Sequence, residues 1–191
     1  MTVVLEDIYQ RHNASAVLRS CDCFGVQDVH IIENRNEYNI SSDVAVGSDK
    51  WLNIKKYNEL ENNTLAAINS LKKSGYRIIA TTPHTNDVTL DTFDIDKGKF
   101  AIFFGAELPG LSDIVMDNAD EFLKIPMYGF TESFNISVSA ALTMNTLYSR
   151  LIKSNVNWQL TEQEHDEVLL SWFKASIKSS EEIIERFIEK Q

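Results

Sequence analysis

Residues 125–141 read IPMYGFTESFNISVSAA. The segment begins as the end of a strand, turns at Pro126 and Gly129, and continues into a helix through Ser133 and Asn135. Serine and asparagine commonly satisfy the free amides of a helix start. Small polar side chains at such a start can also bind the polar atoms of a ligand. From this stretch alone, two interpretations remain possible: a well-capped helix without a further role, and a ligand site. The apolar face of the helix consists of Ala140, Ala141, Leu142, Met144 and Leu147.

A second segment supplies a strand and a glycine-containing loop. Residues 100–104 read FAIFF, a continuous apolar run typical of a buried strand, and residues 105–112 read GAELPGLS. A glycine at the end of a strand lets a ligand approach the backbone closely. Parallel α/β sheets bind their ligands at the carboxyl ends of the strands. We therefore expect Glu107, the one acid in this loop, to face a pocket.

Strands and helices alternate along most of the chain, which predicts an α/β fold with a mainly parallel sheet and helices on both faces. Periodicity alone suggests a Rossmann-like strand order. We expect Asn13 and Asn63 to cap two of the helices. The segments 33–49 and 86–98 read as loops, the first long and mobile and the second acidic. The predicted strands are 2–5, 29–32, 50–57, 76–80, 100–104 and 122–125, and the predicted helices include 14–23, a helix from 63 to near 75, and 112–119.

The C-terminal residues predict two more helices. Residues 161–164 read TEQE and residues 179–182 read SSEE, and both have the pattern of a capping box. Apolar side chains at helical spacing follow each one, which favours packing on the sheet domain or on a second subunit. We therefore divide the chain into a domain of residues 1–155 and a helical extension of residues 156–191.

Composition restricts the class of protein. The chain has 191 residues, of which 43% are hydrophobic and 24% charged, as in ordinary globular proteins. It contains no apolar run near the ~20 residues of a membrane span. The N-terminus lacks a basic region and a cleavage signal, so we expect a cytoplasmic protein. Cys21 and Cys23 are predicted to be buried free thiols, and the four histidines have no metal-ligand spacing with them, so we expect no metal site.

Three separated motifs make the chain similar to the SpoU family of S-adenosylmethionine-dependent RNA ribose 2′-O-methyltransferases. The motifs are residues 13–22, NASAVLRSCD, residues 104–112, FGAELPGLS, and residues 125–141. Within the family, the first motif and residues 47–51, GSDKW, most resemble the enzymes that modify guanosine-18 in the D-loop of tRNA. The resemblance covers nearly the whole chain.

The resemblance implies features that periodicity cannot show. It implies a deep trefoil knot in the C-terminal part, a homodimer with the active site near the interface, and S-adenosylmethionine as methyl donor. The implied donor-binding residues are Thr82, Gly105, Ile125 and Phe134. The implied catalytic residues are Arg19, Asn13, Glu107, Ser133 and Asn135.

Arg19 has the central role in the chemistry that the resemblance implies. Most arginines on helices have no specific role, but here the motif match outweighs that reading. A guanidinium keeps its proton in almost any protein setting. We therefore expect Arg19 to bind a phosphate of the target nucleotide bidentately, so that the phosphate or a water takes the hydroxyl proton. Ser133 and Asn135 would fix the reacting groups, and Glu107 would orient Arg19 or Asn13.

The negative net charge of the chain is unfavourable for binding RNA, which is itself a polyanion. The net charge is −10, but residues 86–121 carry 9 acids and 2 bases, whereas residues 1–85 carry 10 acids and 9 bases. The N-terminal half can therefore present a local basic face. Two classes of function remain open: an RNA 2′-O-methyltransferase, with tRNA preferred and ribosomal RNA as the runner-up substrate, and a non-catalytic RNA-binding dimer.

Overall fold

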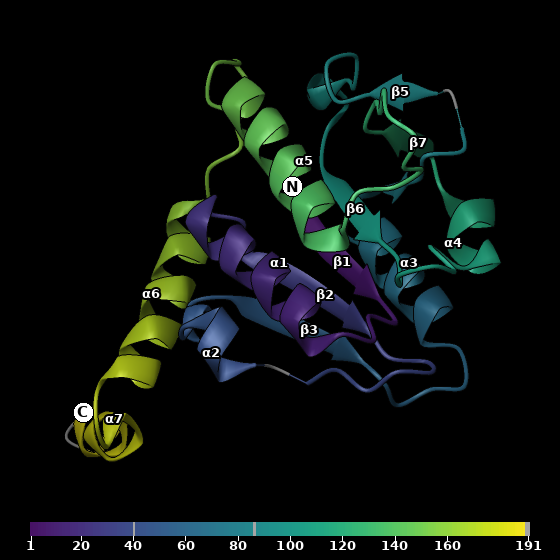
Figure 1. Ribbon diagram of the computed structural model, residues 1–191. Helices are drawn as coiled ribbons and strands as arrows, with labels where there is room; N and C mark the ends of the chain where they lie inside the picture. The colour runs from purple at the N-terminus through teal and green to yellow at the C-terminus, as the bar shows by residue number, and fades with distance from the viewer. Residues whose placement is uncertain (40, 86, 190–191) are drawn as a thin grey trace. The chain divides into compact units, whose positions relative to one another are not determined.

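The computed structural model describes residues 1–39, 41–85 and 87–189 (Figure 1). This part of the chain forms two compact units, Met1–Val156 and Asn157–Gln191. The strands are β1 (Thr2–Glu6), β2 (Asp28–Ile32), β3 (Asn53–Tyr57), β4 (Arg77–Thr81), β5 (Val88–Thr89), β6 (Phe100–Phe104) and β7 (Glu121–Lys124). The α-helices are α1 (Arg11–Cys23), α2 (Ser42–Ala45), α3 (Asn63–Lys73), α4 (Asp113–Asn118), α5 (Ile136–Leu151), α6 (Glu162–Ser176) and α7 (Ser180–Ile188). Two 3₁₀ helices are η1 (Ser48–Lys50) and η2 (Ile95–Lys97).

The strands of the first unit form one parallel sheet. Within the described residues, its seven strands have the order β3-β2-β1-β6-β4-β7-β5, and each pairing is parallel. The prediction of a mainly parallel sheet is confirmed. The Rossmann-like order is wrong, because β6 rather than β4 lies beside β1. Periodicity identifies strands but not their neighbours, which explains the error.

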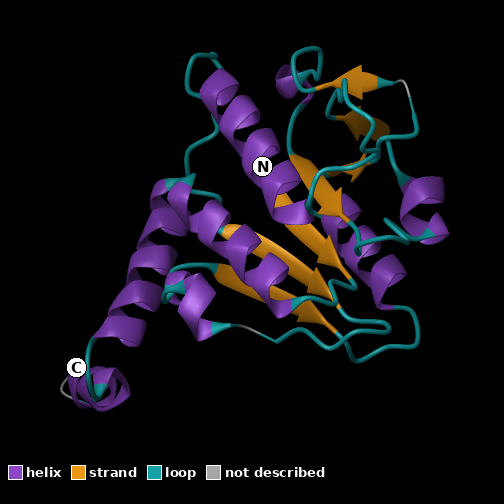
Figure 2. Cartoon of the chain, viewed as in Figure 1, coloured by secondary structure: helices purple, strands orange, loops and turns teal. Residues whose placement is uncertain are grey.

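Two hydrophobic cores cover the two faces of the sheet. Successive side chains of a strand point to opposite faces, so β6 contributes Ile102 and Phe104 to one core and Ala101 and Phe103 to the other. The first core also contains side chains of α1 and α5, and the second contains side chains of α3 and α4. Figure 2 shows helices on both faces of the sheet, as predicted.

Two predicted helix caps are wrong by a few residues. Asn13 lies inside α1, and Gln10 is the N-cap residue. Asn13 is therefore not the cap residue, and its side-chain amide forms hydrogen bonds with the side chains of Gln10, Glu107 and Asn135. Asn62, not Asn63, caps α3, because its side chain accepts a hydrogen bond from the Leu65 N–H at 2.9 Å.

The segment 33–49 is more ordered than a simple loop, since it contains α2 and begins η1. Asp7, the residue directly after β1, organises the first part of this segment. One Asp7 carboxylate oxygen accepts hydrogen bonds from the N–H groups of Asn34 at 2.7 Å and Arg35 at 2.9 Å. The signal that the sequence reading missed is this acid, which lies 27 positions before Asn34 and 28 before Arg35. Residue 40 is outside the described residues.

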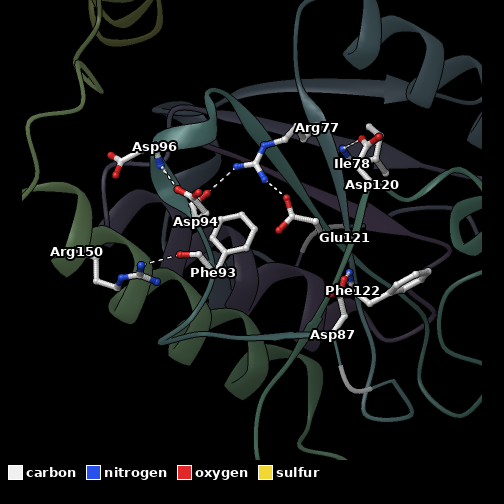
Figure 3. Close-up of polar contacts among 10 residues, drawn as sticks. All are labelled: Arg77, Ile78, Asp87, Phe93, Asp94, Asp96, Asp120, Glu121, Phe122 and Arg150. Atoms are coloured by element: carbon white, nitrogen blue, oxygen red, sulfur yellow. Dashed lines mark hydrogen bonds and ion pairs between the residues drawn. The ribbon is translucent and has the colours of Figure 1, made fainter.

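The acidic segment 86–98 also differs from the prediction, because it contains β5 and η2. Two arginines hold it in place (Figure 3). The Arg77 guanidinium pairs with Glu121 and donates to the Asp94 carbonyl at 2.8 Å. The Arg150 guanidinium, on α5, donates to the carbonyls of Leu90 and Phe93, each at 2.6 Å. Residue 86 is outside the described residues.

Several of the acids in this region accept hydrogen bonds from the backbone (Figure 3). Asp120 accepts from the Ile78 N–H at 2.7 Å, and Asp87 accepts from the Phe122 N–H at 2.9 Å. Asp94 caps η2 by accepting from the Asp96 N–H at 2.9 Å. Much of the negative charge of residues 86–121 therefore has a structural use.

The helix predicted after residue 125 begins later than expected. Asn135 is the N-cap of α5 and accepts a hydrogen bond from the Ser137 N–H at 2.9 Å, so Ser133 precedes the helix. Ala140, Met144 and Leu147 are fully buried, as predicted for an apolar face. Leu142 is 39% exposed and does not belong to that buried face.

The second unit, described by itself, consists of α6 and α7. Thr161 and Glu164 form the predicted capping box at the start of α6. The capping box predicted at residues 179–182 is wrong, because Ser179 has φ 59° and its side chain makes no capping hydrogen bond. Among the described residues, no helix is long and apolar enough to cross a membrane.

Candidate functional site

A cavity of about 670 Å³ opens at the carboxyl ends of β4, β6 and β7. Its size is in the range of small-molecule sites, and its position is where parallel sheets bind ligands. The loops after these three strands line it, together with the residues that lead into α5. The lining residues are Thr81, Thr82, Pro83, His84, Phe104, Gly105, Ala106, Glu107, Leu108, Pro109, Gly110, Leu111, Met116, Leu123, Ile125, Met127, Glu132, Ser133, Phe134, Asn135, Ile136 and Ser139.

The loop after β6, residues 105–112, folds back tightly on itself. The Gly110 N–H donates to the Ala106 carbonyl at 2.9 Å, and the two residues form an isolated antiparallel bridge. A Cβ atom on Gly105 would lie 2.2 Å from the Gly110 carbonyl carbon and 2.3 Å from the Leu111 nitrogen. No side chain fits there, so the loop requires glycine at position 105.

A hydrogen-bonded cluster joins three of the predicted catalytic residues. The Asn13 side-chain amide donates to a carboxylate oxygen of Glu107. The Asn135 side-chain amide donates to the Asn13 amide oxygen at 3.1 Å and to the same Glu107 oxygen at 3.4 Å. The cluster therefore connects α1, the 105–112 loop and the start of α5. Asn13 is 7% exposed, whereas Asn135 is exposed beside the cavity.

Asn135 has two tasks at this position. Its side-chain oxygen accepts from both the N–H and the hydroxyl of Ser137, at 2.9 and 2.6 Å, which caps α5. Its side-chain nitrogen donates into the cluster with Asn13 and Glu107. Both sides of one amide are used, so the helix cap fixes the direction of the amide nitrogen.

Arg19 and Ser133 lie outside this hydrogen-bonded cluster. Arg19 is exposed on α1, and within the described residues its side chain makes no hydrogen bond or ion pair. The sequence left two possible partners for Glu107, namely Arg19 and Asn13. In the structure Glu107 accepts a hydrogen bond from Asn13. Ser133 lines the cavity from the segment before α5.

The four residues predicted to bind the donor all line the cavity: Thr82, Gly105, Ile125 and Phe134. Sequence reasoning missed other lining residues, among them His84 and Met116. His84 follows β4, a neighbour of β6, so the rule that ligands bind at carboxyl ends of adjacent strands could have found it. Met116 comes from α4, and its position depends on how the loop before that helix folds.

The pKa values of two side chains, those of Cys21 and Tyr38, are raised by their surroundings, although neither residue lines the cavity. Burial raises the pKa of the Cys21 thiol, which keeps it protonated and unreactive. Burial likewise raises the pKa of the Tyr38 phenol. Cys23 is exposed, so the prediction that both thiols are buried is wrong for this residue. Among the described residues, no three His, Cys, Asp or Glu side chains converge where they could hold a metal ion.

A parallel sheet with a loop-lined cavity at its carboxyl ends defines the class of α/β proteins that bind a small organic ligand there. The chain belongs to the SpoU rRNA Methylase family, whose model matches residues 1–145.

Two relatives of known name are similar over most of their length. The tRNA (guanosine(18)-2′-O)-methyltransferase of Borreliella burgdorferi is 44% identical over 179 residues, which cover 94% of this chain and 80% of that protein. The enzyme of the same name from Thermus thermophilus is 30% identical over 177 residues, covering 91% of this chain and 88% of that protein.

Solved structures agree with this assignment of the fold. The A. aeolicus TrmH/SpoU tRNA modifying enzyme matches with a TM-score of 0.78 and 26% identity, covering 93% of this chain and 89% of that one. The SpoU methyltransferase AviRb from Streptomyces viridochromogenes, solved in complex with the cofactor AdoMet, matches with a TM-score of 0.68 and 19% identity. That match covers 81% of this chain and 59% of AviRb, and at this identity it concerns the fold alone.

Proposed function

We propose that the protein is an S-adenosylmethionine-dependent RNA ribose 2′-O-methyltransferase that acts on guanosine-18 of tRNA. The observation that carries the proposal is the cluster of Asn13, Glu107 and Asn135 at the cavity. These residues come from the three separate sequence motifs of the family, and the fold brings them into contact. Relatives that carry the name of this enzyme support tRNA as the substrate.

The cavity fits a methyl donor of the size and chemistry of S-adenosylmethionine. Gly105 lets the loop fold back tightly against Gly110 and Leu111 at the cavity wall, while Ile125 and Phe134 add apolar surface and Thr82 a polar group. Adenine needs such a combination, because its faces are apolar and its edge forms hydrogen bonds. When bound, S-adenosylmethionine supplies an electrophilic methyl group, and its sulfur keeps the electron pair of the broken carbon–sulfur bond.

The residues of this chain would act on the RNA hydroxyl by positioning. Asn13 is held by Glu107 and Asn135, so its orientation is fixed before any substrate binds. Such preorganisation saves the entropy of ordering the site during the reaction. Ser133 and Asn135, on the segment leading into α5, would fix the reacting ribose beside the donor.

Arg19 would bind a phosphate of the target nucleotide through both arms of its guanidinium. Because the side chain is exposed, it is accessible to a polyanion. The guanidinium is already protonated and has no free acceptor, so it cannot take the hydroxyl proton. The hydroxyl proton would therefore pass to the bound phosphate or to a water.

We further propose that the protein is a homodimer, as the resemblance to the SpoU family implies. α5 exposes Val138 by 43% and Leu142 by 39%, and Phe134, 42% exposed, lies one turn earlier. These three apolar side chains are spaced four residues apart and would be covered by a second copy. A stable monomer in light scattering at micromolar concentration would contradict the dimer.

We also propose the knot, the division into domains and the cellular location that the sequence suggested. The deep trefoil knot in the C-terminal part is proposed from the family resemblance. Residues 1–155 would be the methyltransferase domain and residues 156–191 its helical extension. A tRNA-modifying enzyme would work in the cytoplasm.

The test is methyl transfer from labelled S-adenosylmethionine to an unmodified tRNA transcript, followed by digestion to nucleosides. We expect 2′-O-methylguanosine at position 18. A matched transcript with 2′-deoxyguanosine at that position should accept no label. Transfer to ribosomal RNA alone would favour the runner-up substrate. Donor binding with no transfer to either RNA would favour the non-catalytic dimer.

A further inference from the structure

Glu6 is a buried acid that the family motifs do not include. It is the last residue of β1, only 2% exposed, and it does not line the cavity. Within the described residues no lysine, arginine or histidine pairs with it. A buried carboxylate without a cation is costly unless hydrogen bonds stabilise it. Its hydrogen bonds therefore indicate what the residue is for.

Three hydrogen bonds converge on the Glu6 carboxylate. Oε2 accepts from the Ser112 backbone N–H at 2.8 Å, and Oε1 accepts from the Ser112 hydroxyl at 2.7 Å. Oε1 also accepts from the Thr64 hydroxyl, on α3, at 2.6 Å. Two of the three bonds thus go to one residue, Ser112, which lies 106 positions away in sequence.

Ser112 is the last residue of the 105–112 loop and the N-cap of α4. Its hydroxyl oxygen accepts from the Val115 N–H at 3.4 Å while the hydroxyl donates to Glu6. The preceding residue, Leu111, and Met116 on the following helix both line the cavity. A shift of Ser112 would therefore move two parts of the cavity wall.

The loop is fixed at two points. Glu107, near its start, is held by Asn13 and Asn135 at the cavity. Ser112, at its end, is held by Glu6 behind the cavity wall. Between these points Leu108 has φ 73°, a backbone conformation that is strained for a leucine. A loop that contains such strain needs firm attachment at both ends.

We propose that Glu6 is a positioning residue for the methyl donor: it fixes the Ser112 end of the 105–112 loop and thereby shapes the cavity. The inference rests on the proposed function, because it takes S-adenosylmethionine as the ligand of this cavity. Glu6 touches no ligand itself and acts through Ser112.

The proposal predicts a particular effect of Glu6→Gln. Whichever way the new amide turns, its NH₂ group meets either the Ser112 N–H or the two hydroxyls, so the three bonds cannot all be kept. We expect S-adenosylmethionine to bind about tenfold more weakly, since hydrogen bonds to charged groups are the strong ones. Calorimetric titration of the full chain measures this.

Thr64→Val is the matched control. It removes the third hydrogen bond to Glu6 but leaves both bonds to Ser112. We expect a loss of thermal stability comparable with that of Glu6→Gln and donor affinity within about twofold of the wild type. The comparison separates positioning of the loop from a general loss of stability.

The outcomes are distinguishable. If the wild type does not bind S-adenosylmethionine, the proposed function fails and the inference fails with it. If the wild type binds and folded Glu6→Gln binds equally well, or Thr64→Val weakens binding as much as Glu6→Gln, the inference alone is overturned. If Glu6→Gln does not fold, Ser112→Ala decides, because it removes the hydroxyl bond from the other side. Normal donor affinity in folded Ser112→Ala would overturn the inference, and weakened affinity would support it.

Discussion

The side-chain amide of Asn135 donates a hydrogen bond at 3.1 Å to the amide oxygen of Asn13, a residue 122 positions earlier in the chain. Glu107 accepts from both amides, so the three side chains form a closed cluster. Each residue comes from a different structural element, and two of these elements, the 105–112 loop and the start of α5, also line the cavity. The cluster thus ties the residues proposed for catalysis to the loops proposed for donor binding.

Asn135→Ser should separate helix capping from the cluster. Serine is a good N-cap residue, so the free energy of unfolding should change by no more than ~1 kcal/mol. Its short side chain cannot reach Asn13, and we expect methyl transfer to fall roughly a hundredfold, as for other lost preorganised donors. Urea unfolding and a tRNA methylation assay measure the two effects. Activity within a factor of three of the wild type would exclude a catalytic role for the cluster.

Gly105→Ala should abolish donor binding. Its Cβ would meet the backbone of Gly110 and Leu111 at 2.2 to 2.3 Å, which backbone atoms cannot relieve without moving the loop. Gly129→Ala is the matched control, because nothing lies within 4 Å of the Cβ position at Gly129. We expect calorimetry to detect S-adenosylmethionine binding only in the control. Binding by both variants would mean that the loop tolerates movement.

The sequence predicted the buried strands best, because one apolar segment contains the whole signal of such a strand. The strand Phe100–Phe104 is observed as predicted, since a continuous apolar run bounded by polar residues belongs to a buried strand. The four donor-site residues were predicted through the family motifs, and all four line the cavity. Their role as donor ligands stays a prediction.

What the sequence could not supply is contact between distant residues. Asn13 was predicted as a helix cap because asparagine before an apolar-periodic segment has that pattern. Besides Gln10, its side-chain partners are Glu107 and Asn135, which are 94 and 122 positions away, and no local pattern indicates these two. The same limit applies to Glu6, whose bond to Ser112 spans 106 positions. The strand order of the sheet was missed for the same reason.

Arg150→Ala should destabilise the first unit. The guanidinium donates to the Phe93 carbonyl (Figure 3) and also to the Leu90 carbonyl, which links the acidic segment to α5. We expect the free energy of unfolding to fall by about 2–3 kcal/mol, because two carbonyls lose a charged donor. Lys153→Ala, a change of an exposed cation one turn later, should stay within about 0.5 kcal/mol. Urea unfolding compares the two, and equal losses would contradict a specific role for Arg150.

His30 should make stability depend on pH. Burial lowers its pKa from 6.5 to about 4, while Asp28 raises it and Lys55 lowers it further. Above pH 6.5 the imidazole is neutral in both the folded and the unfolded chain. As the pH falls from 6.5 towards 4, His30 becomes protonated in the unfolded chain but stays neutral in the folded chain. The free energy of unfolding therefore decreases in this pH range.

His30→Gln should remove this contribution. Between pH 7 and pH 4.5 the wild type should lose on the order of 2 kcal/mol more stability than the variant. Denaturant unfolding at the two pH values measures the difference. An equal loss in both proteins would show that His30 is protonated as easily in the folded chain as in the unfolded one.

Arg19 is the central residue of the proposed mechanism, because this exposed side chain alone is proposed to bind the RNA phosphate. Arg19→Ala should leave S-adenosylmethionine binding nearly unchanged, since the residue does not line the cavity. Arg19→Lys should restore little activity, because an ammonium cannot form the bidentate grip of a guanidinium.

The most direct measurement is single-turnover methyl transfer to tRNA by Arg19→Ala, with donor affinity measured by calorimetry on the same preparation. We predict a fall in rate of roughly a hundredfold or more, which corresponds to about 2–4 kcal/mol of lost transition-state stabilisation. Donor affinity should stay within about twofold, as expected for a substitution outside the donor site. Wild-type rates in Arg19→Ala would contradict the proposed role of Arg19, and near-full activity in Arg19→Lys would show that a simple positive charge suffices.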